Sequence, residues 1–265
     1  MKSIIKTLAL TGIVSLFIIS CKKNDLQQQQ QDPISQEVLT QIHNLGFNNT
    51  DVQKVEEGYL VEGDIILTNA SLSERPTSPS LRIAEVEQYN TFYLVKNYPR
   101  TINVSVSGTV STAFSDAVNG AIARYNAQNL TLTFQRVPSG GQINIRIVNT
   151  GQYIASSGFP TSSGEPYNEV KYAKKYTNYS AGFMTTVIAH EMGHCIGFRH
   201  TDYMNRSYSC GTGGNEGQET TGVGAVYIPG TATGPDAASW MLACLSSTTN
   251  RPFNTNDVTA LKYLY

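Results

Sequence analysis

Three histidines and a glutamate stand close together in this chain, in the sequence HEMGHCIGFRH at residues 190–200. On a helix, His190 and His194 project from one face a single turn apart, so both imidazoles can bind the same metal ion. Glu191 follows the first histidine and carries a carboxylate that can act as a general base. The chain has 4 histidines in all, and this stretch uses three of them. The pattern predicts a metal-dependent hydrolytic site.

Gly197 comes three residues after His194, at the point where the helix must end. Glycine tolerates the left-handed backbone conformation that closes a helix, so the chain can turn there and bring His200 back as a third ligand. Zinc binds imidazole nitrogen at about 2.0–2.1 Å, and three protein ligands leave a fourth position for water, as in catalytic sites. We therefore expect Zn²⁺ as the cofactor, bound by His190, His194 and His200.

This ligand set predicts the hydrolysis of peptide bonds. Bound zinc lowers the pKa of water towards about 7 and polarises the carbonyl that the water attacks. Glu191 takes the proton of the water and later delivers a proton to the leaving amine. An ordinary buried helix is the alternative, but it would have to bury three histidines and a glutamate without partners. We expect a zinc-dependent endopeptidase that acts on proteins or peptides outside the cell.

The composition of the chain suits one medium globular domain with short extra segments. It has 265 residues, a formal net charge of −1 and only 15% charged residues. Because there is no basic excess, nucleic acid is not expected as a partner. The chain is expected to be a monomer.

The N-terminus has the features of an export signal. Two lysines precede an apolar run at residues 8–19, which is too short for a membrane span. The sequence FIISC that ends at Cys21 resembles a bacterial lipobox, which implies a signal peptide at residues 1–20 and a lipid on the Cys21 sulfur. Because Lys22 follows, the resemblance favours an outer-membrane or cell-surface lipoprotein of a Gram-negative-type bacterium. The alternative is a plain secretory peptide and a secreted protein.

Composition shifts divide the rest of the chain. We expect a polar tether at residues 21–33, an N-terminal segment with its linker at 34–83, and a catalytic domain at 84–265. In the segment, apolar residues at helical spacing precede strand formers at 59–68, which are interrupted at Gly63. Residues 69–83 are rich in serine and proline and are expected to form a linker. The segment is either a propeptide or an N-terminal packing extension.

The catalytic domain alternates strand and helix patterns, which predicts a sheet with helices on it. Strands are expected at residues 101–107, 130–137, 143–148, 153–157 and 169–173, and a helix at 111–128. The strand at 153–157 is a candidate sheet edge, and such an edge can accept a peptide by strand addition. Ser180 is expected to cap the helix that carries the histidines. Loop follows to about residue 237, and residues 256–265 are expected to form a closing helix.

The stretch at residues 190–200, followed by Thr201 and Asp202, resembles the HEIGH-type bacterial metallopeptidases, and the layout is similar to astacin-like metzincins. The resemblance covers roughly residues 59–265. It implies an α+β, metzincin-like zincin fold. Such a fold has a twisted, mostly parallel sheet with an edge strand, a central zinc helix, and a small C-terminal subdomain with a closing helix.

Metzincins also have a methionine in a turn beneath the zinc. By resemblance, Met241 in the sequence Ser-Trp-Met fits this Met-turn, and Met204 is the rival. Astacin-like enzymes have a tyrosine two residues after this methionine, whereas this chain has Ala243. The resemblance therefore does not carry a tyrosine ligand or oxyanion helper over to this position. Simple core packing of Met241 is the alternative.

Residues 61–65, with the sequence VEGDI, resemble the Phe-x-Gly-Asp stretch of astacin-like propeptides. In those propeptides the aspartate occupies the zinc in place of the catalytic water, so the resemblance implies Asp64 as a latency ligand. Val61 stands where the pattern has phenylalanine. The alternative is that Asp64 caps a strand turn, with Gly63 in a bulge.

Three cysteines remain after Cys21. A disulfide between Cys210 and Cys244 is favoured, since both lie after the zinc helix, and Cys195–Cys210 is the next choice. Cys195 is expected to pack as a small apolar residue. Asp202 either orients His200 or a neighbouring loop, or lies at the surface.

Two other functions remain open from the sequence. One is a surface-anchored binding module that contains zinc but does not turn over substrate, and the presence of Glu191 argues against it. The other is a toxin-like protease with one narrow target.

Overall fold

The structure is a computed structural model that describes residues 33–73, 88–211, 225–231 and 234–265. Pro33–Tyr265 form one compact unit. The predicted signal peptide, the lipidation site Cys21 and the tether as far as residue 32 lie outside the described residues. In the part of the chain that the structure describes, every helix is too short or too polar to cross a bilayer.

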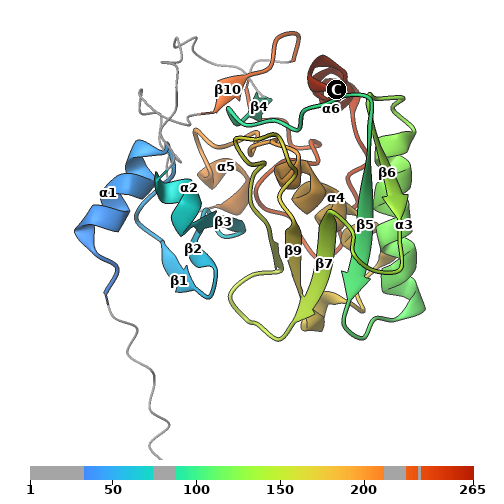
Figure 1. The fold of residues 1–265 in the computed structure, drawn as a ribbon, viewed down its shortest axis with the longest axis horizontal. Helices are drawn as coiled ribbons and strands as arrows, with labels where there is room; N and C mark the ends of the chain where they lie inside the picture. Colours follow the sequence, from blue (N-terminus) through green and yellow to red (C-terminus); the bar gives the residue numbers. More distant parts are fainter. Residues whose placement is uncertain (1–32, 74–87, 212–224, 232–233) are drawn as a thin grey trace, which may run out of the picture. The chain divides into compact units, whose positions relative to one another are not determined.

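A five-stranded sheet organises this unit (Figure 1). Its strands, from one edge to the other, are β6 (Leu132–Arg136), β5 (Arg100–Ser107), β7 (Ile143–Val148), β9 (Glu169–Ala173) and β8 (Ala155–Ser156). The first four run parallel, and β8 pairs with β9 in the antiparallel direction. The predicted mostly parallel sheet with its edge strand is confirmed, although β8 is shorter than the predicted 153–157.

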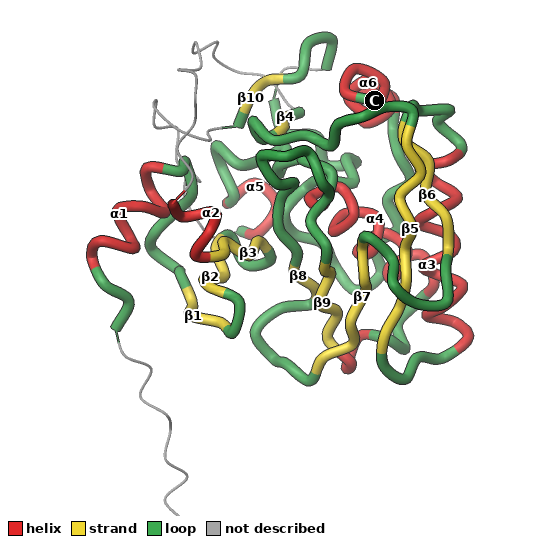
Figure 2. Tube along the Cα trace, in the orientation of Figure 1, coloured by secondary structure: helices red, strands yellow, loops and turns green. Residues whose placement is uncertain are grey.

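Two helices of 15 residues pack on one face of the sheet, α3 (Thr112–Asn126) and α4 (Ala181–Cys195). They contact each other, and α3 lies against β6 while α4 lies against β8 and β9 (Figure 2). The Ser111 hydroxyl caps α3 by accepting from the backbone N–H of Phe114, at 3.2 Å. The buried residues of α3 recur at helical spacing, which explains why the sequence predicted this helix correctly.

The closing helix is α6 (Thr255–Leu264). It begins with a capping box, in which the side chains of Asn254 and Asp257 each accept from the other residue's backbone N–H. The predicted C-terminal helix is therefore confirmed.

The N-terminal segment folds into a helix and a small antiparallel sheet. It contains α1 (Gln36–Asn44) and a meander of three antiparallel strands, β1 (Gln53–Val55), β2 (Gly58–Val61) and β3 (Ile65–Thr68). Its apolar side chains form a separate core cluster, to which Phe159 of the catalytic part is added. The predicted helix and the strand pair interrupted at Gly63 are confirmed. Cleavage of this segment stays a prediction.

The predicted linker at 69–83 is wrong in its first five residues. These form the helix α2 (Asn69–Ser73), because the Thr68 hydroxyl accepts from the N–H of Ser71 at 3.1 Å and Leu72 is buried. Residues 74–83 lie outside the described residues.

The stretch after His200 is not only loop. It contains the short helix α5 (Ser207–Cys210) and the strand β10 (Val226–Tyr227), which pairs with β4 (Tyr89–Asn90). A 3-10 helix, η1 (Lys174–Tyr176), follows β9. The pairing of β10 with β4 joins segments far apart in the chain, which local sequence patterns do not reveal.

Candidate metal centre

Helix α4 carries the first part of the site through the interior of the molecule. The Ser180 hydroxyl caps it by accepting from the N–H of Phe183 at 3.3 Å, as the sequence predicted. Every residue from Phe183 to Cys195 is buried. Polar side chains on such a helix face other protein groups and not solvent, so His190, Glu191 and His194 must find partners inside the protein.

Gly197 ends α4 and turns the chain back towards the metal donors. Its φ of 110° lies in the left-handed region, as predicted. The N–H of Gly197 donates to the His194 carbonyl, and the N–H of Phe198 donates to the Gly193 carbonyl, both at 2.9 Å. This pair of bonds is the Schellman arrangement. It directs the next residues back beside the helix, where His200 meets the other two histidines.

The three histidines point their Nε2 atoms at one place. The His194 Nε2 lies 3.1 Å from that of His190 and 3.2 Å from that of His200. The Asp64 Oδ2 lies 3.2 Å from the His200 Nε2 and 3.5 Å from the His190 Nε2. A tetrahedral zinc site with bonds of about 2.0–2.2 Å places its ligand atoms about 3.3–3.6 Å apart. These four distances are close to that spacing, and all four donor atoms lie within 4.8 Å of one another, near enough to bind one metal ion.

The opposite ring nitrogens fix which tautomer is present. The Nδ1 of His190 lies 2.8 Å from the Trp240 carbonyl, and the Nδ1 of His194 lies 2.7 Å from the Phe198 carbonyl. Because a carbonyl oxygen only accepts, each Nδ1 carries the proton and each Nε2 presents a lone pair. Burial and the two neighbouring histidines hold the pKa of His194 well below its usual value. These neutral nitrogens face each other, which suits a bound cation.

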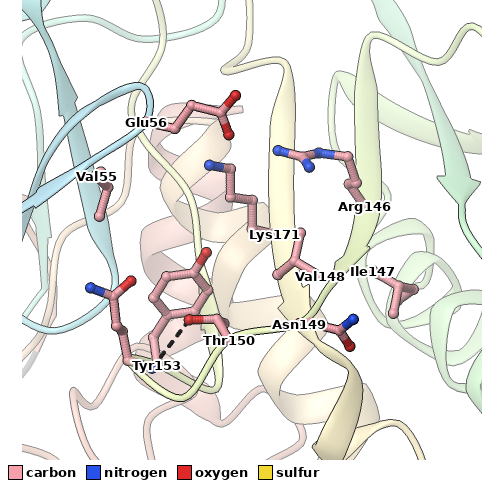
Figure 3. A pocket seen from close by; sticks show the side chains of 10 residues that line it. Val55, Glu56, Arg146, Ile147, Val148, Asn149, Thr150, Tyr153 and Lys171 are labelled. Atoms are coloured by element: carbon pink, nitrogen blue, oxygen red, sulfur yellow. Dashed lines mark hydrogen bonds between the residues drawn. The ribbon is translucent and has the colours of Figure 1, made fainter. Parts of the chain in front are cut away.

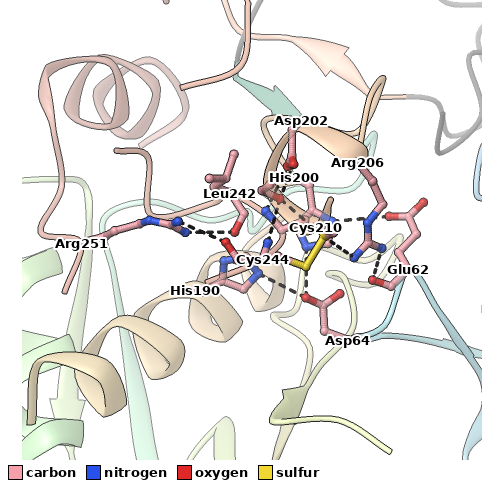
Figure 4. The surroundings of a disulfide bond; sticks show 12 residues. Glu62, Asp64, His190, His200, Asp202, Arg206, Cys210, Leu242, Cys244 and Arg251 are labelled. Atoms are coloured by element: carbon pink, nitrogen blue, oxygen red, sulfur yellow. Dashed lines mark hydrogen bonds and ion pairs between the residues drawn. A yellow bond between two sulfur atoms is a disulfide. The ribbon is translucent and has the colours of Figure 1, made fainter. Parts of the chain in front are cut away.

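Asp64 reaches the site from the tip of the hairpin that joins β2 to β3. Glu62 and Gly63 adopt φ values of 55° and 89°, which close this tight turn and direct the Asp64 carboxylate at the histidines (Figure 4). Burial opposes ionisation, but His200 and the hydrogen bonds with His190 and His200 hold the pKa of Asp64 well below its usual value. The carboxylate is therefore ionised and is available as a fourth donor.

Glu191 lies beside the donors and is almost fully buried. Its carboxylate accepts a hydrogen bond from the Ser157 hydroxyl at 2.6 Å. Burial, together with the charge of Asp64, raises the pKa of Glu191 well above its usual value, while the bond from Ser157 acts in the opposite direction. A carboxylate with a raised pKa next to a metal site can both accept and return a proton.

Met241 lies against the histidine helix at Gly193. A Cβ on Gly193 would come within 2.6 Å of the Met241 sulfur, so only glycine permits this close approach. Met241 is fully buried, and its carbonyl accepts from the N–H of Thr201 at 3.0 Å. The rival Met204 is only half-buried. The structure thus brings Met241, and with it the Trp240 carbonyl, beneath the donors.

Asp202 and the disulfide tie the chain after His200 to the Met241 segment (Figure 4). Asp202 is fully buried, so it is not a surface residue. Its carboxylate accepts from the N–H of Ala243 at 3.0 Å and from the Ser209 hydroxyl at 2.5 Å. Cys210 and Cys244 form a disulfide, the pairing that the sequence favoured, and Cys195 is a buried free thiol.

The structure contains a buried ion pair next to the donors that the sequence did not predict. The Arg199 guanidinium donates to the Glu62 carboxylate at 2.8 Å, and both side chains are fully buried. The Phe47 ring lies under the guanidinium at 4.2 Å. The available signal was Arg199 itself, because an arginine within a buried apolar motif needs a carboxylate partner. The sequence could not say that Glu62 supplies it.

A pocket of about 450 Å³ lies where the β1–β2 hairpin meets β7 and β9 (Figure 3). It contains none of the metal donors. Two of its cations already have acidic partners, since Lys171 pairs with Glu57 and Arg146 pairs with Glu57 and Glu169. The pocket therefore marks a second attachment of the N-terminal segment and is not the reactive centre.

The chain is similar to two solved structures and matches one family model. Among solved structures, the structure of myroilysin has 17% identity and a TM-score of 0.44, covering 63% of this chain and 93% of that chain. A second, the crystal structure of myroilysin, has 15% identity and a TM-score of 0.40, covering 62% and 82%. None of the curated proteins matches. A family model described as a dual-action HEIGH metallo-peptidase matches residues 59–265, which include all four donors and Glu191, and the chain therefore belongs to the HEIGH metallopeptidase family.

Proposed function

We propose that this metallopeptidase is a zinc-dependent endopeptidase that cleaves extracellular proteins and is made as a latent zymogen. The observation that carries the proposal is the set of four donor atoms within 4.8 Å of one another, three of them imidazole nitrogens, with the Glu191 carboxylate beside them. Three imidazoles with a carboxylate or water in tetrahedral geometry are typical of zinc. His190, His194 and His200 would hold the ion. Zinc bound there supplies Lewis-acid activation of water and of the scissile carbonyl.

The chain's own residues supply the proton transfers. Glu191 accepts the proton of the attacking water and returns a proton to the leaving amine. The neutral state of His194 leaves its Nε2 available as a ligand.

The edge of the sheet supports peptide binding beside the site. The N–H of Ser157 donates to the Asp64 carbonyl at 2.9 Å, and the Ser157 carbonyl accepts from the N–H of Ile66 at 2.6 Å. The N-terminal segment is thus paired with the chain just after β8, as an added strand would be. We propose that a substrate backbone uses the same edge once the segment has left.

Three acidic residues support latency. Asp64 takes the fourth donor position, Glu62 pairs with Arg199, and Glu57 pairs with Lys171. A carboxylate in the fourth position excludes the water that hydrolysis needs. Cleavage within residues 75–80, which lie outside the described residues, would separate this segment from the catalytic part.

A metzincin type is part of the proposal. The close approach of Met241 to Gly193, the parallel sheet with an antiparallel edge strand, and the closing helix support it.

The variant Glu191→Gln tests the proposed function. The chain is folded in full, cut at a site introduced within residues 75–80, and assayed on casein. We expect the rate to fall by at least about 100-fold, the lower range for loss of a general base, while the metal content stays that of the wild type. Glu165→Gln, at an exposed glutamate of the same chemistry, is the control. Full activity in Glu191→Gln, or loss of its metal, would contradict the assignment.

A further inference from the structure

Ser157 makes a contact that the proposed reaction does not yet use. It follows β8 directly, and its side chain is fully buried. Its Oγ lies 2.6 Å from the Glu191 Oε2 and 3.1 Å from the Glu191 backbone carbonyl. A hydroxyl has one proton to donate, and the shorter distance to the carboxylate directs it there.

The same residue faces the peptide-binding edge with its backbone. Its N–H and carbonyl are the groups that pair with Asp64 and Ile66 of the N-terminal segment. Successive strand residues point to opposite faces, so the neighbouring Ser156 directs its side chain away from Glu191. Ser157 therefore contacts both parts of the site. Its backbone pairs with the chain bound at the sheet edge, and its hydroxyl contacts the carboxylate of the proposed base.

The Glu191 side chain needs such a contact. A glutamate has three rotatable bonds, and holding it in one conformation costs side-chain entropy. Proton transfer requires the carboxylate oxygen within hydrogen-bonding distance of the reacting atoms. A short hydrogen bond to one oxygen, Oε2, selects one orientation of the carboxylate.

We infer that Ser157 is a positioning residue, which fixes the orientation of the Glu191 carboxylate through its hydroxyl and couples that orientation to the edge strand. The inference rests on the proposed role of Glu191 as the general base. Because the backbone of Ser157 also pairs with the N-terminal segment, whose place we propose that a substrate takes, the binding of a peptide and the orientation of the base depend on one residue.

The variant Ser157→Ala tests this in the chain that has been folded in full and then cut within residues 75–80. We expect kcat to fall by about 10–100-fold, as for a misplaced catalytic group. KM is expected to stay within about twofold of the wild type, because the backbone contacts are unchanged. Ser157→Thr restores the hydroxyl and should recover most of the rate. Ser156→Ala, at the adjacent buried serine, is the matched control and should leave both constants unchanged.

Two further measurements separate positioning from a structural role. In a Glu191→Gln background, Ser157→Ala should cause no further fall, because the residue acts through Glu191. Crystal structures of the wild type and Ser157→Ala should show the Glu191 carboxylate turned away in the variant. An equal fall in both backgrounds, or an unmoved carboxylate, would overturn the inference. If Ser157→Ala does not fold, Ser157→Cys keeps the size with a weaker donor and takes its place.

The crystal comparison does not depend on turnover. A wild-type chain that hydrolyses no protein after cleavage would refute the proposed function, while the position of the Glu191 carboxylate would still decide the role of Ser157. Hydrolysis that is unaffected by Ser157→Ala would refute the positioning role alone.

Discussion

The hydrogen bond made by Nδ1 decides the tautomer of His190 and of His194. His190 and His194 donate from Nδ1 to the carbonyls of Trp240 and Phe198. These bonds orient the rings and direct both Nε2 lone pairs at the same point. At the scale of single residues, the donor set is therefore preorganised by backbone oxygens that have no ionisable chemistry of their own.

His194 is the donor with the most central place, because its Nε2 is close to those of both other histidines. In the chain cut within residues 75–80 and separated from the segment that carries Asp64, we expect His194→Ala to lose stoichiometric zinc, since only two protein ligands remain. Elemental analysis after dialysis measures this. The wild type, cut and separated in the same way, serves as the control and should keep its metal. A His194→Ala protein that still holds one zinc per chain would refute the ligand assignment.

Among the elements, the β2–β3 hairpin brings the N-terminal segment to the metal donors. Its turn places Glu62 against Arg199 and Asp64, two positions later, against His200. Arg206, which precedes α5, also donates to the Glu62 carbonyl. The hairpin is thus held by side chains on both sides of its tip, and this geometry keeps a carboxylate in the fourth donor position.

Asp64→Ala removes that carboxylate from the hairpin. In the uncut chain we expect higher casein hydrolysis than in the wild type, because the fourth donor position becomes available to water. The comparison is made before any cleavage, with the N-terminal segment still attached. Asp51→Ala, at an exposed aspartate of the same segment, should leave the activity of the uncut chain unchanged. Equal activity of Asp64→Ala and the wild type would rule out latency through this residue.

On the scale of the whole molecule, two distant segments are tied together beneath the donors. The disulfide between Cys210 and Cys244 joins the chain after His200 to the Met241 segment. On the other side, the Asp257 carboxylate of α6 accepts from the Ser239 hydroxyl at 2.8 Å and from the N–H of Trp240 at 3.2 Å. The segment that orients His190 is therefore fixed from both sides.

Removing the disulfide should weaken this arrangement. The two cysteines are 34 residues apart, and closing a loop of that length stabilises a protein by about 4 kcal/mol in the chain-entropy account. We expect the double variant Cys210→Ser and Cys244→Ser to lose roughly that free energy of unfolding, measured in urea. A reducing agent should destabilise the wild type and leave the double variant unchanged. An undiminished unfolding midpoint would contradict the expectation.

At the same scale, Cys21, outside the described residues, is the residue through which we propose that the protein is attached to a membrane. We propose that it carries a lipid, because the apolar run before it ends in a lipobox-like sequence. Cys21→Ser should then release the protein from the membrane fraction into the soluble fraction. Cys195→Ser, at the buried free thiol, is the control and should stay with the membranes. Continued membrane fractionation of Cys21→Ser would refute the lipid anchor.

The sequence by itself determined the local parts of this site. The four-residue spacing of His190 and His194 and the glycine at 197 depend only on helix geometry and backbone conformation, and the structure has both. The strands and helices of the sheet were also readable, because their apolar periodicity is local. The first residues of the supposed linker were not, because α2 depends on the burial of Leu72 against other elements.

Only the tertiary structure decided which distant groups complete the site. A resemblance nominated Asp64, but the folded hairpin decides that its carboxylate lies 3.2 Å from the His200 Nε2. The roles of Ser157 and of the Trp240 carbonyl could not be predicted from the sequence, because neither a serine nor a backbone oxygen is distinctive in a sequence. Their roles arise from hydrogen bonds between segments far apart in sequence, and such bonds form only when the whole fold brings a donor and an acceptor within about 3 Å.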